Sequence, residues 1–114
     1  MCRVFLVEPP RPNIDLSAAR EHGELHYIFD VDDRRASVFH SEQFGLDVLR
    51  QLEQRRFDPR VDCIAATGSL VPVAVALAAI VCRYPRVNVL FYSANESRYV
   101  KRGIGQDEWI RSKK

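Results

Sequence analysis

Residues 61–92 read VDCIAATGSLVPVAVALAAIVCRYPRVNVLFY, and this stretch sets the architecture expected for the chain. Its apolar and β-branched residues predict one buried strand over 61–66 and another over 87–92. Between them, the turn at 66–69 and Pro72 predict a helix over 70–83. Ser69 would be its N-cap, and the proline falls in the first turn, where a missing N–H is tolerated. A strand, a helix and a strand in this order predict a βαβ unit with parallel strands.

The uncharged run from Cys63 to Cys82 is also long enough to be considered as a membrane span. As one helix, its twenty residues would cover about 30 Å, which is close to the hydrocarbon thickness of a bilayer. The break at 66–69 shortens the helix to about 21 Å. We therefore expect a helix of a globular domain and no membrane span.

The N-terminal part of the chain predicts shorter elements. The run RVFLV at 3–7 predicts a buried strand, and the weaker pattern over 15–22 predicts a short helix that stops at a glycine. The runs at 25–29 and 36–39 flank a polar turn, which predicts an antiparallel hairpin.

The most regular amphipathic pattern lies at 42–56. Its apolar positions fall on one stripe of a helix, namely Phe44, Val48, Leu49 and Leu52. Ser41 is suited to cap the first turn, and Pro59 prevents the helix from continuing. Together these patterns predict an α/β sandwich with a mixed sheet of about five strands, whose C-terminal βαβ unit is a Rossmann-like half. We expect one domain over 1–102 and a basic tail over 103–114.

Composition and charge exclude several functional classes. The 114 residues are 46% hydrophobic and 28% charged, which is typical of one globular domain and not of a disordered chain. The net charge of +2 indicates no general preference for nucleic acid. The three cysteines form no CxxC pair and share no ligand spacing with the three histidines. We therefore expect a cytoplasmic chain without metal or cofactor, in which Cys63 and Cys82 are core residues.

The expected helix at 70–83 lacks a polar face. From Leu70 to Cys82 no side chain is charged and all are apolar or small. A helix that covers one face of a sheet in a monomer normally has a polar side. We therefore predict a homodimer, the commonest assembly, through Ala74, Leu77, Ala78 and Val81. The alternative is a monomer in which the segment 15–22 and the tail cover the helix.

The turn Thr67-Gly68-Ser69 is the best candidate for a ligand site. It joins the end of a strand to the start of a helix, where N–H groups and the helix dipole attract phosphate or carboxylate groups. The string ATGS resembles the phosphate loop of phosphoribosyltransferases, but Cys63-Ile64-Ala65 stands where that family has paired acids. The alternative is a plain tight turn with a serine cap.

No catalytic residue is predicted. The string YIFDVD at 27–32 resembles the first motif of haloacid-dehalogenase-type phosphatases, in which two aspartates lie on one face of an extended chain. The sequence has no convincing later pair of Mg²⁺-binding acids, so a solvated turn explains Asp30 and Asp32 better. We expect a protein that is not an enzyme.

Two groups of basic residues suggest macromolecular partners. Basic and aromatic side chains interleave after residue 97, and a nucleic-acid contact would use Arg98, Tyr99, Lys101, Arg102 and Trp109. An acidic protein partner would instead meet Arg34, Arg35, Arg50, Arg55 and Arg56.

The features over 1–102 follow a characteristic order. A short strand and a hairpin precede the FDPRVD junction at 57–62, the TG turn, the apolar helix and LFYSANESRYV at 90–100. This order resembles small uncharacterised α/β proteins of phages and mobile elements, and the resemblance implies no known activity. Our leading hypothesis is a non-enzymatic interaction or accessory protein that acts as a homo-oligomer. The alternatives are nucleotide or phosphate binding at the Thr67-Gly68-Ser69 turn and nucleic-acid binding by the basic, aromatic tail.

Overall fold

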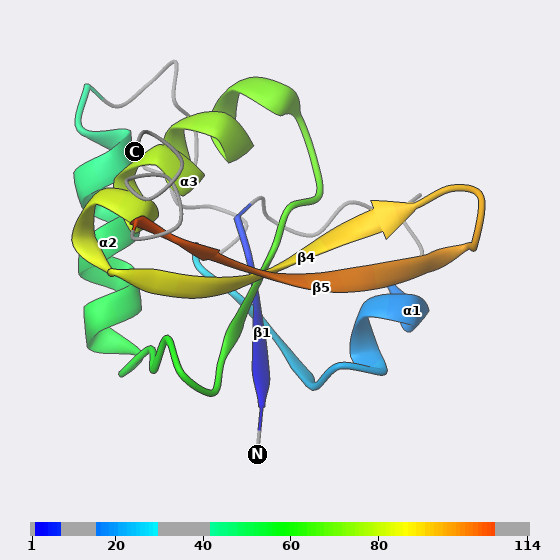
Figure 1. The fold of residues 1–114 in the computed structure, drawn as a ribbon. Helices are drawn as coiled ribbons and strands as arrows, with labels where there is room; N and C mark the ends of the chain where they lie inside the picture. Colours follow the sequence, from blue (N-terminus) through cyan, green and yellow to red (C-terminus); the bar gives the residue numbers. More distant parts are fainter. Residues whose placement is uncertain (1, 8–15, 30–41, 107–114) are drawn as a thin grey trace, which may run out of the picture.

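A mixed sheet of five strands forms the centre of the fold, with helices on both of its faces (Figure 1). The computed structural model describes residues 2–7, 16–29 and 42–106. Its elements are, in chain order, β1 (Arg3–Leu6), α1 (Ser17–Arg20), β2 (Glu24–Tyr27), α2 (Phe44–Gln54), β3 (Cys63–Ala65), α3 (Leu70–Arg83), β4 (Arg86–Ser93) and β5 (Arg98–Gly105). The predicted fold class, α/β with a mixed sheet of about five strands, is confirmed.

The strands lie in the order β2-β1-β3-β4-β5. The pairs from β2 to β4 are parallel, and β5 pairs antiparallel with β4. Strand β3, helix α3 and strand β4 form the predicted βαβ unit, and α3 has the bounds that the sequence suggests. Because β1 lies between β2 and β3, the connections that follow β1 and β3 lead to opposite sides of the sheet.

The alternation of side chains along the strands divides the core into two layers. On the side of α2 and α3, the buried strand residues are Phe5, Ile64, Val87 and Val89. On the side of α1, they are Val4, Leu6, Cys63, Ala65, Leu90 and Tyr99. The central strands contribute to both layers, which explains why their sequences are apolar without interruption.

Helices α2 and α3 pack together over one face of the sheet. Pro72, Ala76 and Ile80 are buried, and they recur every four residues along one side of α3. Gly45 of α2 lies against α3, where an added Cβ would be 3.2 Å from the Cβ of Ala79. The glycine therefore allows the two helices to approach closely. Within the described residues, no helix is both long enough and apolar enough to cross a membrane.

The structure corrects both ends of the helix predicted over 42–56. It begins later than expected, with Gln43 at the N-cap, and the Gln43 carbonyl accepts the N–H of Asp47 at 2.8 Å. It also ends earlier, because Arg56 has a φ of +56° and leaves the helical conformation. Ser41, the predicted cap, lies outside the described residues.

Strands β2 and β5 also differ from expectation. β2 pairs in parallel with β1, and the second strand of the expected hairpin, at 36–39, lies outside the described residues. β5 forms where the sequence suggests only a polar stretch. A turn at 94–97, in which Ser97 has a φ of +52°, returns the chain alongside β4, and eight residue pairs join the two strands.

Candidate functional site

The outer face of α3 is an exposed apolar surface. It consists of Leu70, Val71, Ala74, Ala78 and Cys82, which are all exposed. Leu70 is 81% exposed and Val71 is 48% exposed, and Leu70 has the highest value among the large hydrophobic side chains that the structure describes. This face lies opposite the buried side of α3.

The structure divides the predicted interface residues between two environments. Ala74 and Ala78 are exposed on the outer face of α3. Leu77 and Val81 are half-buried and pack against the core of the domain. Helix α1, which in the monomer alternative would help to cover α3, instead contacts β2 and β5 on the other face of the sheet.

The Thr67-Gly68-Ser69 turn joins β3 to α3 as predicted. Gly68 has a φ of +114°, which glycine adopts without strain, and both Gly68 and Ser69 are exposed. Ser69 holds the N-cap position in an extended conformation. The sheet order brings this turn beside the carboxyl end of β1.

The basic residues of β5 do not form one surface. Lys101 and Arg102 are exposed, but neighbouring residues of a strand point to opposite faces of the sheet. Arg98 pairs with Glu96 at 2.8 Å. Tyr99 is only 4% exposed and packs against Tyr92, which is 54% exposed, so Tyr92 is the exposed ring of this pair. Trp109 lies outside the described residues.

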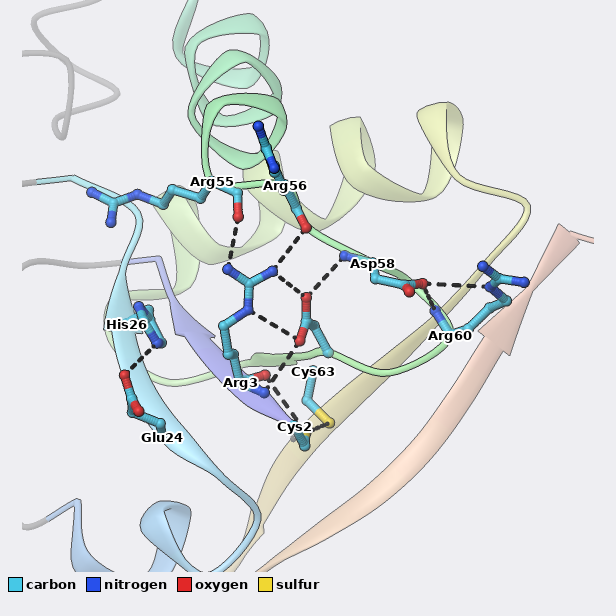
Figure 2. A network of polar contacts seen from close by, with 10 residues as sticks. Cys2, Arg3, Glu24, His26, Arg55, Arg56, Asp58, Arg60 and Cys63 are labelled. Atoms are coloured by element: carbon cyan, nitrogen blue, oxygen red, sulfur yellow. Dashed lines mark hydrogen bonds and ion pairs between the residues drawn. The ribbon is translucent and has the colours of Figure 1, made fainter.

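The structure describes three members of the predicted arginine cluster, one with a side-chain ion pair and two whose backbone carbonyls bind Arg3. Arg50 lies 3.9 Å from the carboxylate of Asp47. Arg55 and Arg56 offer their backbone carbonyls to the guanidinium of Arg3, at 2.7 and 2.8 Å (Figure 2). Arg34 and Arg35 lie outside the described residues.

Arg3 and Asp62 form a partly buried ion pair that the sequence did not predict. The guanidinium of Arg3 donates to both carboxylate oxygens of Asp62, from Nε at 3.3 Å and from a terminal nitrogen at 2.8 Å (Figure 2). The backbone N–H groups of Arg3 and Asp58 donate to the same carboxylate at 3.2 and 2.9 Å. The position of Asp62 could have indicated this ion pair, since a charged residue inside a run predicted as a buried strand requires a partner.

The environment of Asp62 shifts its ionisation. Burial acts to raise the pKa of this carboxyl group, but hydrogen bonds from the Arg3 guanidinium and from the Asp58 and Arg3 backbone N–H groups outweigh burial. The pKa of Asp62 therefore lies below its ordinary value of 3.8. Asp62 is therefore a carboxylate at neutral pH and orients Arg3, whose guanidinium joins β1 to the end of α2.

The cysteines also depart in part from expectation. Cys63 is buried as predicted, but Cys82 is exposed on α3, because it falls on the side of the helix that turns away from the core. Cys2, for which no role was predicted, places its Sγ 3.5 Å from the Sγ of Cys63. In the part of the chain that the structure describes, no group of three or more possible ligands could hold a metal ion.

These features define a small α/β protein with a mixed five-stranded sheet and an exposed apolar helix face. The model of the family described as phage Pam3 gp32-like protein matches residues 2–105, and the chain belongs to this family. The phage relationship suggested by the order of its sequence features is therefore confirmed. A search of the curated proteins and a search of the solved structures each found no match.

Proposed function

We propose that this phage-family protein is a non-enzymatic interaction protein that pairs with a second copy of itself through the outer face of α3. The observation that carries the proposal is the exposure of Leu70 (81%) and Val71 (48%) at the start of a helix that has no charged side chain before Arg83. Burial of an exposed leucine or valine side chain contributes about 1.5–3 kcal/mol. A face with two such side chains therefore favours association.

The small residues in the middle of the face suit contact between two helices. Ala74 and Ala78 lie one turn apart, and their short side chains allow a second helix to approach closely. Leu70 lies at one end of the face and Cys82 at the other. A two-fold axis between Ala74 and Ala78 would place the leucine end of each copy against the opposite end of its partner. Such a dimer buries the same face on both copies.

An arginine at the centre of the face tests this proposal. In Ala78→Arg the new side chain is tolerated in the exposed monomer, but a dimer would have to bury an unpaired charge. Sedimentation equilibrium at micromolar concentration should give twice the chain mass of 13.1 kDa for the unchanged protein and the single mass for the variant. Ala94→Arg, at an exposed alanine of the β4–β5 turn, is the matched control and should remain dimeric. A monomeric unchanged protein, or a dimeric Ala78→Arg, would contradict the proposal.

Phosphate or nucleotide binding at the Thr67-Gly68-Ser69 turn is the second candidate function. The supporting observation is the position of this exposed turn at the carboxyl end of β3, beside β1, where the following connections lead to opposite sides of the sheet. Open α/β sheets commonly bind ligands at such points. A ligand at about one hundred times its Kd would stabilise the fold by about 2.7 kcal/mol. Thermal unfolding with inorganic phosphate and a nucleotide panel measures this effect, and an unchanged Tm throughout would exclude the second candidate.

A further inference from the structure

Two thiols from distant parts of the chain meet on the face of the sheet that carries α1. Cys2 precedes β1, Cys63 begins β3, and their Sγ atoms are 3.5 Å apart (Figure 2). We propose that this pair is a redox-sensitive modification site, at which a low-molecular-weight disulfide such as glutathione disulfide converts the two thiols into an intramolecular disulfide. The site is separate from the outer face of α3 and does not depend on the proposed dimer.

The sheet brings the two side chains together. Val4 is the register partner of Cys63 in the parallel pair of β1 and β3. Side chains two residues apart along a strand point to the same side, so Cys2 lies on the same face as Cys63. An S–S bond is about 2.05 Å long, and the two sulfur atoms therefore need to approach by about 1.5 Å. Cys2 precedes β1 and lies two positions from the register partner of Cys63, so closure combines rotation of the two side chains with a shift of the backbone before β1.

The neighbours of both cysteines hold this arrangement in place. Arg3, next to Cys2, donates its backbone N–H and two guanidinium N–H groups to Asp62, which is next to Cys63. The N–H of Glu24 donates to the carbonyl of Cys2 at 3.2 Å. These contacts tie the backbone beside Cys2 to the Asp62 side chain and to β2, and they keep the two thiols close together.

The two thiols have different roles in the exchange. Burial, together with the adjacent Cys2 thiol, raises the pKa of Cys63 to about 12, so Cys63 is protonated at neutral pH. Cys2 is the more exposed of the two. Its thiolate attacks one sulfur of glutathione disulfide, which forms a mixed disulfide and releases one glutathione thiolate.

Closure of the protein disulfide completes the reaction. Cys63 first loses its proton to the solvent, and the resulting thiolate attacks the Cys2 sulfur of the mixed disulfide. This step breaks the bond to the second glutathione, which leaves as a thiolate and takes up a proton. Two protein thiols and one glutathione disulfide thus become one protein disulfide and two molecules of glutathione.

Cys82 supplies a control within the same molecule, because it is exposed on α3, on the opposite face of the sheet. The full chain is equilibrated with increasing ratios of glutathione disulfide to glutathione, and the remaining thiols are blocked before peptide mass mapping. We expect the Cys2 and Cys63 peptides to be joined, with the loss of two hydrogen atoms, and any glutathione adduct to be found on Cys82 and not on Cys2 or Cys63. Dithiothreitol should restore the original thiols.

Single substitutions distinguish the Cys2–Cys63 disulfide from non-specific modification of the cysteines. Cys82→Ser should form the same link, and Cys63→Ser should leave glutathione attached to Cys2. Cys2→Ser changes the less buried member of the pair, so it keeps the test valid if Cys63→Ser fails to fold. It should leave Cys63 unmodified. Glutathione retained on Cys2 in the unchanged protein, or a disulfide only between chains, would overturn the proposal.

Discussion

Asp62 is a carboxylate whose side chain is 3% exposed, and it lies beside the 29% exposed side chain of Arg3. The removal of two charges from water is unfavourable unless their hydrogen-bonding groups are satisfied in the folded protein. Both oxygens of Asp62 accept hydrogen bonds here, and the guanidinium of Arg3 also binds the Arg55 and Arg56 carbonyls at the end of α2. Loss of either partner would therefore leave an unpaired, partly buried charge.

Replacement of Asp62 by asparagine should weaken the fold and alter its response to acid. We expect Asp62→Asn to lower the free energy of unfolding by about 2–3 kcal/mol at neutral pH, because Arg3 loses its counter-ion. The pKa of Asp62 is lowered in the folded state, so its contribution is present above 3.8 and is lost as the pH falls through the folded-state value. Urea denaturation at neutral and acidic pH should show a smaller loss of stability on acidification for the variant than for the unchanged protein.

Asp58→Asn provides the matched control for this experiment. Asp58 undergoes the same chemical change, but its side chain is 39% exposed and contacts the nearby Arg60 in an ion pair at 3.5 Å. We expect a change within about 0.5 kcal/mol, as is usual for exposed ion pairs. If both variants lose the same free energy of unfolding, the Arg3–Asp62 ion pair contributes no more to stability than the exposed pair does.

At the scale of elements, the end of α2 carries a backbone conformation that glycine would favour. Arg56 has a φ of +56°, and its N–H donates to the Glu53 carbonyl while the Phe57 N–H donates to the Leu52 carbonyl. This is the arrangement in which helices usually have glycine, and another residue there costs about 1–2 kcal/mol. Glycine keeps the carbonyl that binds Arg3. We expect Arg56→Gly to raise the free energy of unfolding by about 1 kcal/mol in urea denaturation, after the greater flexibility of the unfolded chain is included.

An arginine-to-glycine substitution in the middle of α2 should lower the free energy of unfolding, which is the opposite effect. Arg50 is exposed in the middle of the helix, where glycine is about 1 kcal/mol less favourable than good helix formers. Arg50→Gly should therefore lower the stability that Arg56→Gly raises. Destabilisation by both variants would contradict the role assigned to the positive φ of Arg56.

The elements differ in how much of them the sequence could predict. Helix α3 was predictable in full, because the Thr67-Gly68-Ser69 turn and Pro85 limit an apolar run at both ends. Strand β5 was not, because the residues after Ser93 form a polar and charged stretch without a strand pattern of its own. Its formation depends on pairing with β4, which is a non-local interaction.

At the scale of the whole molecule, the contacts that the sequence could not predict join segments far apart in the chain. Arg3 and Asp62 are 59 positions apart, and Cys2 and Cys63 are 61 positions apart. Both pairs arise because β1 and β3 become neighbours in the sheet, a strand order that local patterns do not specify. The outer face of α3 was predictable as an apolar surface, but the half-buried environment of Leu77 and Val81 was not, since it depends on how the helix rotates against the core.

The same long-range contact gives the proposed disulfide a measurable effect on the whole fold. A link between Cys2 and Cys63 would close a long loop in the unfolded chain, and restriction of a loop of this length contributes about 4 kcal/mol to stability. At one protein concentration, the oxidised protein should therefore unfold at a higher urea concentration than the reduced protein. Cys82→Ser should preserve this difference, whereas Cys2→Ser should abolish it. Equal midpoints for the linked and reduced forms would show that the link strains the sheet as much as it restricts the unfolded chain.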